Sequence, residues 1–469
     1  MEKLFKLKQH GTNVRTEIIA GLTTFLSMVY ILAVNPDILS ASGMDKASIF
    51  TATAVSAAFA TAIMGFFANY PVALASGMGL NAYFAFTVVP QIAKMGITDP
   101  WKVALTAILV EGIIFIILSL FKFRETLVNK VPANLKYGIS AGIGLFIVIV
   151  GLKGAGVVVT DAMIVPNEAG EPIISSSTLV QMGDIASPQF ALALIGLVII
   201  ATINHFRVPG AILWGILATW LLGIGAQMIG WYQVDPANGV YSLLPDFSHG
   251  LNIAAPYMFK FDFGFIMQNA IEFAVIVFSF LFVDLFDTVG TLIGVADRGG
   301  LLNKKGELPR AGAALMSDAI GTVAGACLGT STVTSFVESA SGVAAGGRTG
   351  LTAVTTAVLF LAAIVLSPIF LAIPSFATTP ALMFVGLLMM ASVRKMTFEG
   401  GDIAEVIGGF MALIMMPFTY SIANGIMFGI LSWVVLKIFI GKIKDIHPVM
   451  WVASALFAAR IVMLVLNLS

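Results

Sequence analysis

The sequence predicts an all-α protein that crosses a membrane about fourteen times, in two inverted repeats of seven spans with short β-strands in spans 3 and 10. Hydrophobic residues make up 58% of the 469 residues, charged residues only 11%, and the mean hydropathy is +0.98. Soluble domains carry about 25% charged residues. In addition, two apolar segments are short and interrupted, at equivalent places in the two halves of the chain.

The spans follow from the apolar runs, because a spanning helix needs about 20 apolar residues, or fewer where it is broken at mid-depth. We predict spans near residues 16–36, 48–68, 71–90, 101–121, 133–153, 188–204, 209–229, 268–295, 310–328, 329–346, 349–373, 376–393, 401–418 and 421–440. With both termini in the cytoplasm, most Lys and Arg residues fall in inner segments. This charge distribution is the one expected of a correct topology.

The N-terminal segment is polar, and the apolar segment near the C-terminus has two interpretations. The first 15 residues are basic and lack the apolar core and cleavage site of a signal peptide, so we expect the first apolar run to be retained. Residues 449–468 form another apolar stretch, interrupted by Arg460. This stretch could be a fifteenth span, but Trp451, Arg460 and the basic residues before it favour a helix at the headgroup level of the inner face.

Spans 3 and 10 are predicted to be broken. Gly77 and Gly79 favour an extended piece, followed by a half-helix from about Leu80. In the tenth span, residues 330–335 are β-prone and a half-helix can begin near Val337. Because seven is odd, the second repeat must be inverted, and paired interruptions of this kind point to a binding site near the middle of the membrane.

Composition argues against several other classes of protein. The single cysteine, Cys327, allows no intrachain disulfide, and the four histidines lack metal-ligand spacing. The net charge of zero argues against a nucleic-acid partner. The glycine-rich stretch 346–350 lacks the preceding strand and the ending of a phosphate-binding loop. We therefore expect no enzyme, no cofactor and no metal.

Two acidic residues, Asp284 and Glu338, are predicted to lie at membrane depth in matching contexts. A charge there costs at least about 2.5 kcal/mol, and it is kept where it lines a cavity and handles a proton, an ion or a polar solute. The acids therefore indicate transport. Three other acids, Asp318, Glu111 and Glu272, are interpreted as structural.

The surroundings of these two acids suit a flat solute rich in N–H donors, such as a nucleobase. Asp284 and Thr288 are four residues apart and share one helix face. Glu338 stands at the start of a half-helix, whose dipole stabilises a carboxylate. Phe336 and Tyr30 are among the aromatic residues that could stack on a ring. Burial beside a second acid disfavours the charged form of a carboxyl group, so one of them could carry a coupling proton.

Several neighbours are candidates with two interpretations. Asp287 either joins the site and the proton coupling or bonds the broken backbone of span 3 or 10. Ser27 either faces the pocket or bonds back to its own helix. Ser76 and Gly77 are expected to offer backbone donors from span 3, and Ser339 is the corresponding candidate in span 10.

Three motifs, in order along the chain, resemble the signatures of a known family: ASGMGLNAYF at 75–84, DLFDTVGT at 284–291 and TSFVESASGVAAGGRTG at 334–350. They are similar to those of the AzgA-like hypoxanthine/adenine/guanine permeases, a branch of the nucleobase–cation symporter superfamily related to xanthine and uracil permeases. The resemblance covers nearly the whole chain up to about residue 445. The sequence departs from related permeases at Asp284, often Glu there, and at Ser339, commonly Asn there.

The resemblance implies two domains and a place for the substrate. Asp284 and Glu338 would bind it between the two short strands. A core domain (16–130, spans 1–4, and 268–373, spans 8–11) would move like an elevator against a gate domain, in a homodimer. The gate would comprise 131–229 (spans 5–7) and 374–440 (spans 12–14). The remaining parts would be a cytoplasmic N-terminus (1–15), an extracytoplasmic loop (230–267) and a C-terminal tail (441–469).

The hypothesis from the sequence is a proton-coupled symporter that imports a purine nucleobase (hypoxanthine, guanine or adenine) through the inner membrane of a bacterium. Its expected partners are the base, a proton, membrane lipid and a second copy of the chain, with sodium as an open alternative to the proton. The main rival is an anion transporter of the sulfate or bicarbonate type on the same fold. Two half-helix N-termini would suit an anion, but Asp284 and Glu338 would repel it. A channel would need a continuous polar path, which the two isolated short strands do not provide.

Overall fold

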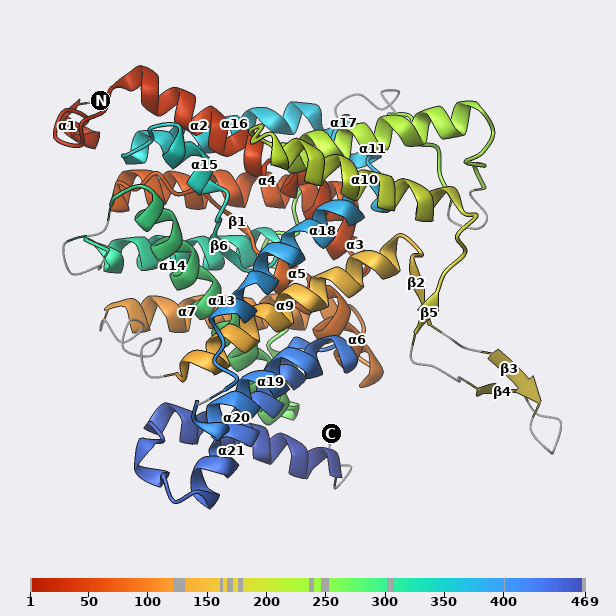
Figure 1. Ribbon diagram of the computed structural model, residues 1–469, viewed down its shortest axis with the longest axis vertical. Coiled ribbons are helices and arrows are strands. Elements are labelled where there is room, and N and C mark those ends of the chain that lie inside the picture. The colour runs from red at the N-terminus through yellow and green to blue at the C-terminus, as the bar shows by residue number, and fades with distance from the viewer. Residues whose placement is uncertain are drawn as a thin grey trace.

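Helices dominate the fold in the computed structural model, and most of the long ones run roughly horizontally in Figure 1. The structure describes residues 2–120, 131–160, 163–166, 172–175, 180–235, 240–245, 253–301, 303, 308–399 and 401–465. Within them, ten helices are long and apolar enough to cross a membrane: Val14–Ser40, Lys46–Ala68, Pro100–Leu120, Ala133–Gly154, Pro188–His205, Ala211–Met228, Ala311–Leu328, Gly350–Ala372, Ser375–Lys395 and Ile422–Phe439. The fold is therefore that of a multi-pass membrane protein, and the larger count of fourteen spans stays a prediction.

The first half of the chain forms α1 (Glu2–Phe5), α2 (Val14–Met28), α3 (Ile31–Ser40), α4 (Lys46–Ile63), η1 (Met64–Ala68), β1 (Leu74–Ser76), α5 (Met78–Tyr83), η2 (Phe84–Val88), α6 (Val89–Lys94), α7 (Pro100–Leu120), α9 (Ala133–Gly154), α10 (Pro188–His205) and α11 (Ala211–Met228). The second half forms α12 (Gly264–Gln268), α13 (Ala270–Arg298), α14 (Ala311–Leu328), β6 (Val333–Ser335), α15 (Ser339–Ala344), α16 (Gly350–Ala362), η4 (Ala363–Leu366), α17 (Ser367–Ala372), α18 (Ser375–Met390), η5 (Ala391–Lys395), α19 (Ile403–Phe418), α20 (Ile422–Phe439), η6 (Ile443–Asp445) and α21 (Pro448–Val465). Each predicted span contains one or more of these elements.

Two small sheets project from the helices, at the lower right of Figure 1. β2 (Val158–Val159) pairs with β5 (Gln181–Met182), and β3 (Met163–Pro166) pairs with β4 (Pro172–Ser175), both antiparallel. These strands lie between the predicted spans 133–153 and 188–204. The β-branched valine and isoleucine residues in these short strands favour extended backbone.

The long helices pack as two groups. The first group, 14–120 with 270–372, holds α2, α4, α7, α14 and α16, which pack on one another. The second group, 133–228 with 375–439, holds α9, α10, α11, α18, α19 and α20. Glycines bring the helices of the second group close: a Cβ at Gly138 of α9 would overlap the carbonyl oxygen of Gly409 in α19. These groups contain the residues predicted for the core and the gate.

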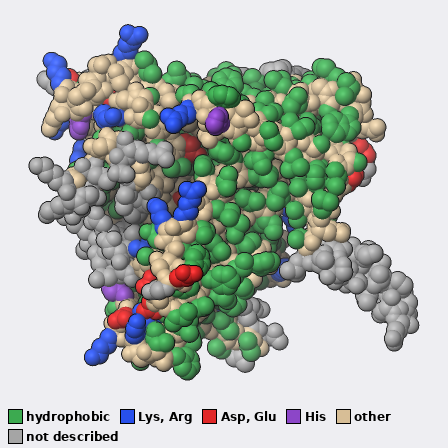
Figure 2. Space-filling model, in the orientation of Figure 1, with side chains coloured by type: hydrophobic (Ala, Val, Ile, Leu, Met, Phe, Trp, Pro, Cys, Tyr) green, Lys and Arg blue, Asp and Glu red, His purple; other side chains and the backbone are tan. Residues whose placement is uncertain are grey.

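The molecular surface separates apolar from charged side chains. Figure 2 shows a broad hydrophobic area over the helices, while Lys and Arg side chains gather mainly in the left half of the view, on the side of the N-terminus. A continuous apolar surface of this kind is what lipid contact requires.

The two predicted strands are present and pair with each other. β1 and β6 are antiparallel, with Leu74 opposite Ser335 and Ser76 opposite Val333. The backbone N–H of Phe336 extends the pair by donating to the carbonyl oxygen of Ala73 at 3.0 Å. Equivalent strands of two inverted repeats must meet in this antiparallel way, so the pairing agrees with the predicted inversion.

The C-terminal helix α21 packs on both α13 and α20. The Phe457 ring meets the Phe278 ring of α13 edge-on at 5.6 Å, and Arg460 Nη2 lies 3.4 Å from Glu272 Oε1. The Arg460 side chain is buried against the protein, and its position at the headgroup level stays a prediction. Pairing with the buried Glu272 carboxylate compensates its charge within the protein.

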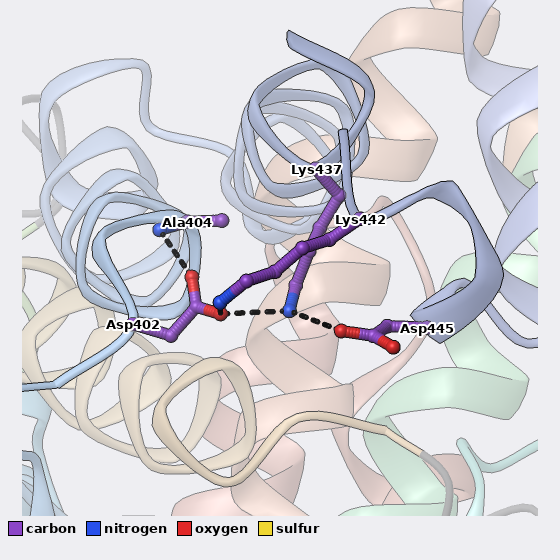
Figure 3. Close-up of polar contacts among 5 residues, drawn as sticks. All are labelled: Asp402, Ala404, Lys437, Lys442 and Asp445. Carbon is purple, nitrogen blue, oxygen red and sulfur yellow. Dashed lines mark hydrogen bonds and ion pairs between the residues drawn. The ribbon is translucent and has the colours of Figure 1, made fainter. Parts of the chain in front are cut away.

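A charge cluster joins the ends of α19 and α20 to the segment before α21 (Figure 3). Asp402 caps α19 by accepting from the Ala404 N–H, and it accepts from Lys437 Nζ at 2.8 Å and from Lys442 Nζ at 3.0 Å. Lys437 also reaches Asp445 at 3.4 Å. The hydrogen bond from Lys437, followed by those from Lys442 and Ala404, lowers the pKa of Asp402 to about 2.

We predict that Asp402→Asn lowers the free energy of unfolding in detergent by about 2 kcal/mol, because the buried Lys437 loses a charged acceptor. Asp445→Asn is the control, since that carboxylate is largely exposed and a change within about 0.5 kcal/mol is expected. A carboxyl group with a depressed pKa stabilises the fold above its ordinary value of 3.8 and loses that contribution as the pH falls toward 2. The stability difference between native protein and Asp402→Asn should therefore shrink below pH 4; a difference independent of pH would contradict this account.

Candidate functional site

A cavity lies between the two helix groups, against the ends of the strand pair. It measures about 70 Å³, which is room for several water molecules. The first group contributes most of the wall, and α9 and α18 of the second group close it. The lining residues are Gly77, Met78, Gly79, Leu80, Ile143, Val283, Asp287, Thr291, Ser335, Phe336, Val337, Glu338, Val385 and Met389. A solute in this cavity would therefore touch both helix groups.

Two carboxylates face this otherwise apolar space. Asp287 comes from α13, and Glu338 comes from the residue just before α15. Both side chains line the same cavity, although they are 51 residues apart in the chain. A pair of acids in an apolar cavity can accept N–H groups of a solute and can exchange protons.

Asp284 and Thr288, both predicted to contact the substrate, lie outside this wall in a buried polar cluster. The Thr288 hydroxyl lies 3.0 Å from Asp284 Oδ1, 2.9 Å from Asp318 Oδ1 and 2.7 Å from the Thr334 hydroxyl. The cluster ties α13 and α14 to β6. Asp284 and Asp287 are about one helical turn apart, and only Asp287 is among the lining residues.

Ser76 and Ser339 hold the two broken segments in shape. The Ser76 hydroxyl donates to Asn81 Oδ1 at 2.7 Å, within the turn into α5. The Ser339 hydroxyl accepts the N–H of Ala73 at 3.0 Å, next to β1. Both serines are fully buried and neither lines the cavity. Their hydroxyls satisfy local polar groups where the helices are interrupted.

Of the other three candidates, two line the cavity and one lies away from it. Gly77 and Phe336 line the cavity, and a Cβ at Gly77 would lie 2.7 Å from Thr334 Cγ2, so only glycine lets the strands close here. Ser27 lies away from the wall: its hydroxyl donates to the carbonyl oxygen of Thr23 at 2.9 Å and accepts from Ser341 at 2.8 Å.

The structure also places Tyr30 in a role that sequence reasoning missed. Its hydroxyl donates to Glu338 Oε1 at 2.6 Å, across 308 residues of chain. We considered Tyr30 for stacking, inside a continuous first span. The first span, Val14–Ser40, is indeed continuous, and Tyr30 lies at the short irregular turn within it, between α2 and α3. Pro36, which lies within α3, was the one sequence signal of an irregular helix there.

Comparison with known proteins now identifies the class. Residues 15–428 match the xanthine/uracil permease group, described as "Permease family", and the chain belongs to this family. It is thus a multi-pass membrane transporter, not an enzyme.

Relatives of similar length refine the match. The chain is 41% identical to the adenine permease AdeP of Escherichia coli, over 98% of this chain and 96% of that protein. It is 43% identical to the guanine/hypoxanthine permease PbuO of Bacillus subtilis, over 98% and 100%. The resemblance inferred from the three motifs is confirmed by these relatives.

Solved structures share the fold at low identity. The transmembrane domain of the cyanobacterial bicarbonate transporter BicA superposes with a TM-score of 0.62 at 16% identity, covering 88% of this chain and 97% of that one. SLC26A9 superposes with a TM-score of 0.64 at 11% identity, covering 91% and 66%. At these identities the similarity shows a shared fold and nothing about the substrate.

We predict that Thr288→Val lowers the free energy of unfolding by about 1–3 kcal/mol, because it removes a buried hydroxyl shared with two aspartates and Thr334. Thr288→Ser keeps the hydroxyl and should lose less than half of that. Thermal unfolding of the purified variants measures both effects. A Thr288→Val protein as stable as the native one but unable to bind substrate would instead favour direct contact with the solute.

Proposed function

We propose that this transporter is a proton-coupled symporter that imports purine nucleobases. The observation that carries the proposal is the apolar cavity lined by Asp287 and Glu338, in a chain whose relatives are named adenine and guanine/hypoxanthine permeases. Purines are flat and carry N–H donors at their edges. Carboxylates would accept these donors, while Phe336 and the aliphatic wall would cover the ring faces.

The paired acids offer a route for coupling to a proton. Two carboxylates that share a poorly hydrated cavity repel each other when both are charged. In our proposal one of them takes up a proton with the base, which reduces the charge that has to move through the membrane. Asp284 and Asp318 are linked through Thr288, which also bonds Thr334 of β6, and in our proposal these buried acids could share the proton.

We propose that transport proceeds by an elevator-like movement of the first helix group, the core, against the second, the gate. A polar contact between the groups supports this assignment: Thr378 of α18 donates to Asp37 Oδ2 of α3 at 2.9 Å. Within the first group, Lys46 Nζ lies 3.3 Å from Asp37 Oδ1. In the predicted topology these residues lie at the outer end of the bundle. The hydrogen bond from Thr378 would then close the outer side, leaving the structure inward-facing.

The proposal includes a homodimer in the inner membrane with a cytoplasmic N-terminus. The rival anion transporter fits the cavity poorly, because Asp287 and Glu338 would repel an anion. The bicarbonate transporter that superposes on this chain shares its fold at only 16% identity.

Uptake of radiolabelled hypoxanthine, guanine and adenine by a purine-uptake-deficient strain tests the function. We expect accumulation of at least one base, abolished by a protonophore. Glu338→Gln should lower the uptake rate about 100-fold, because the site loses its charged acceptor. Glu399→Gln, the same change at an exposed position, is the control. Absence of purine uptake by well-expressed native protein would reject the assignment. Uptake that depends on a sodium gradient and not on a proton gradient would identify sodium as the coupling ion in place of the proton.

A second experiment tests closure at the outer end. In a Cys327→Ser background, a reporter cysteine at Val337 in the cavity is labelled from outside with an impermeant maleimide. Thr378→Val removes the hydrogen bond to Asp37 and should raise the labelling rate about fivefold, the effect of about 1 kcal/mol on a two-state equilibrium. Thr379→Val is the matched control, since its hydroxyl bonds Gly151 inside the gate. Equal rates in the two variants would contradict the closure.

A further inference from the structure

We infer that Tyr30 positions the Glu338 carboxylate and biases the site toward a base that offers it a single N–H group. This inference rests on the proposed function, because it concerns the choice among purines. It goes beyond that function in naming a residue that does not line the cavity.

The first step is the geometry of the pair. The Tyr30 hydroxyl lies 2.6 Å from Glu338 Oε1, and the Tyr30 side chain is fully buried at the start of α3. Glu338 occupies the N-cap position of α15, yet its side chain makes no capping hydrogen bond to that helix. The carboxylate therefore takes its orientation from a donor on a different helix. Hydrogen bonds to a charged acceptor are short and strong, so this contact fixes the side chain.

The second step is that Tyr30 itself is held rigidly. Its ring lies in the main hydrophobic core with Met28, Ile31 and Leu32 around the turn between α2 and α3. Tyr30 is absent from the cavity wall, whereas Glu338 is part of it. Tyr30 can therefore act on a solute only through Glu338, which makes it a positioning residue.

The third step concerns the acceptor left for the solute. Tyr30 occupies Oε1, so Oε2 is the oxygen without competition from the tyrosine. Guanine presents two adjacent donors, N1–H and the 2-amino group, which pair with a carboxylate through both oxygens. Hypoxanthine presents one donor, N1–H, on the same edge. Tyr30 therefore competes with the second donor of guanine at Oε1, whereas the single N–H of hypoxanthine can bond Oε2 of a carboxylate that Tyr30 holds in place.

Initial uptake rates for hypoxanthine and guanine in native protein, Tyr30→Phe and Tyr83→Phe test this inference. Tyr30→Phe keeps the ring and frees the carboxylate. We expect the KM for hypoxanthine to rise about fivefold, because the acid is less well oriented, with Vmax and protein level unchanged. The ratio of the guanine KM to the hypoxanthine KM should fall at least threefold.

Tyr83→Phe is the matched control, because Tyr83 is also buried and its hydroxyl bonds Ser279, away from the cavity. It should leave both KM values as in native protein. If native protein transports purines and Tyr30→Phe leaves both KM values unchanged, with or without a lower Vmax, the inference is overturned and the proposed function stands. Native protein that transports no purine overturns both.

Discussion

The short antiparallel pair of β1 and β6 is the constraint on which the rest of the structure depends. Breaking two helices inside a membrane exposes backbone groups that lipid cannot satisfy. Here the backbone N–H and C=O groups of each strand bond those of the other, and threonine hydroxyls bond further backbone groups of the two strands. Thr61 of α4 both accepts from the N–H and donates to the carbonyl oxygen of Leu74, at 2.9 Å each. Thr322 of α14 donates to the carbonyl oxygen of Val333, also at 2.9 Å.

These two threonines stand in equivalent places, one in the helix before each broken segment, as two inverted repeats require. The same symmetry determines where the cavity lies, because each strand leads into its own half-helix and the two half-helices leave the strand pair in opposite directions.

Buried acids accept hydrogen bonds from donors on other elements of the fold. Glu17 of α2 accepts from the N–H groups of Arg348, Thr349 and Thr352 at the start of α16, so that its charge caps a helix.

The sequence was sufficient for the helical segments, the strands in the broken spans and the family. Apolar length, the Gly77–Gly79 break and the three motifs are local signals, and the structure and the relatives agree with them. It could not decide between Asp284 and Asp287, because both lie on one turn of α13 and packing against β6 orients them. Tyr30 was missed for a similar reason: its hydrogen bond joins residues 308 positions apart. The ion pair of Arg460 was missed because its partner, Glu272, lies on a helix far away in the sequence.

The attachment of α21 gives the last helix a mechanical part in any movement between the groups. It follows α20, a helix of the second group, after a link of eight residues, 440–447, and packs against it. Its Arg460 is paired with Glu272 of α13, which belongs to the first group. If one group slides past the other, as in the proposed elevator movement, α21 must either move with the first group, which would extend that link, or release the ion pair. The length of the link would then limit how far the two groups can separate while the ion pair is kept.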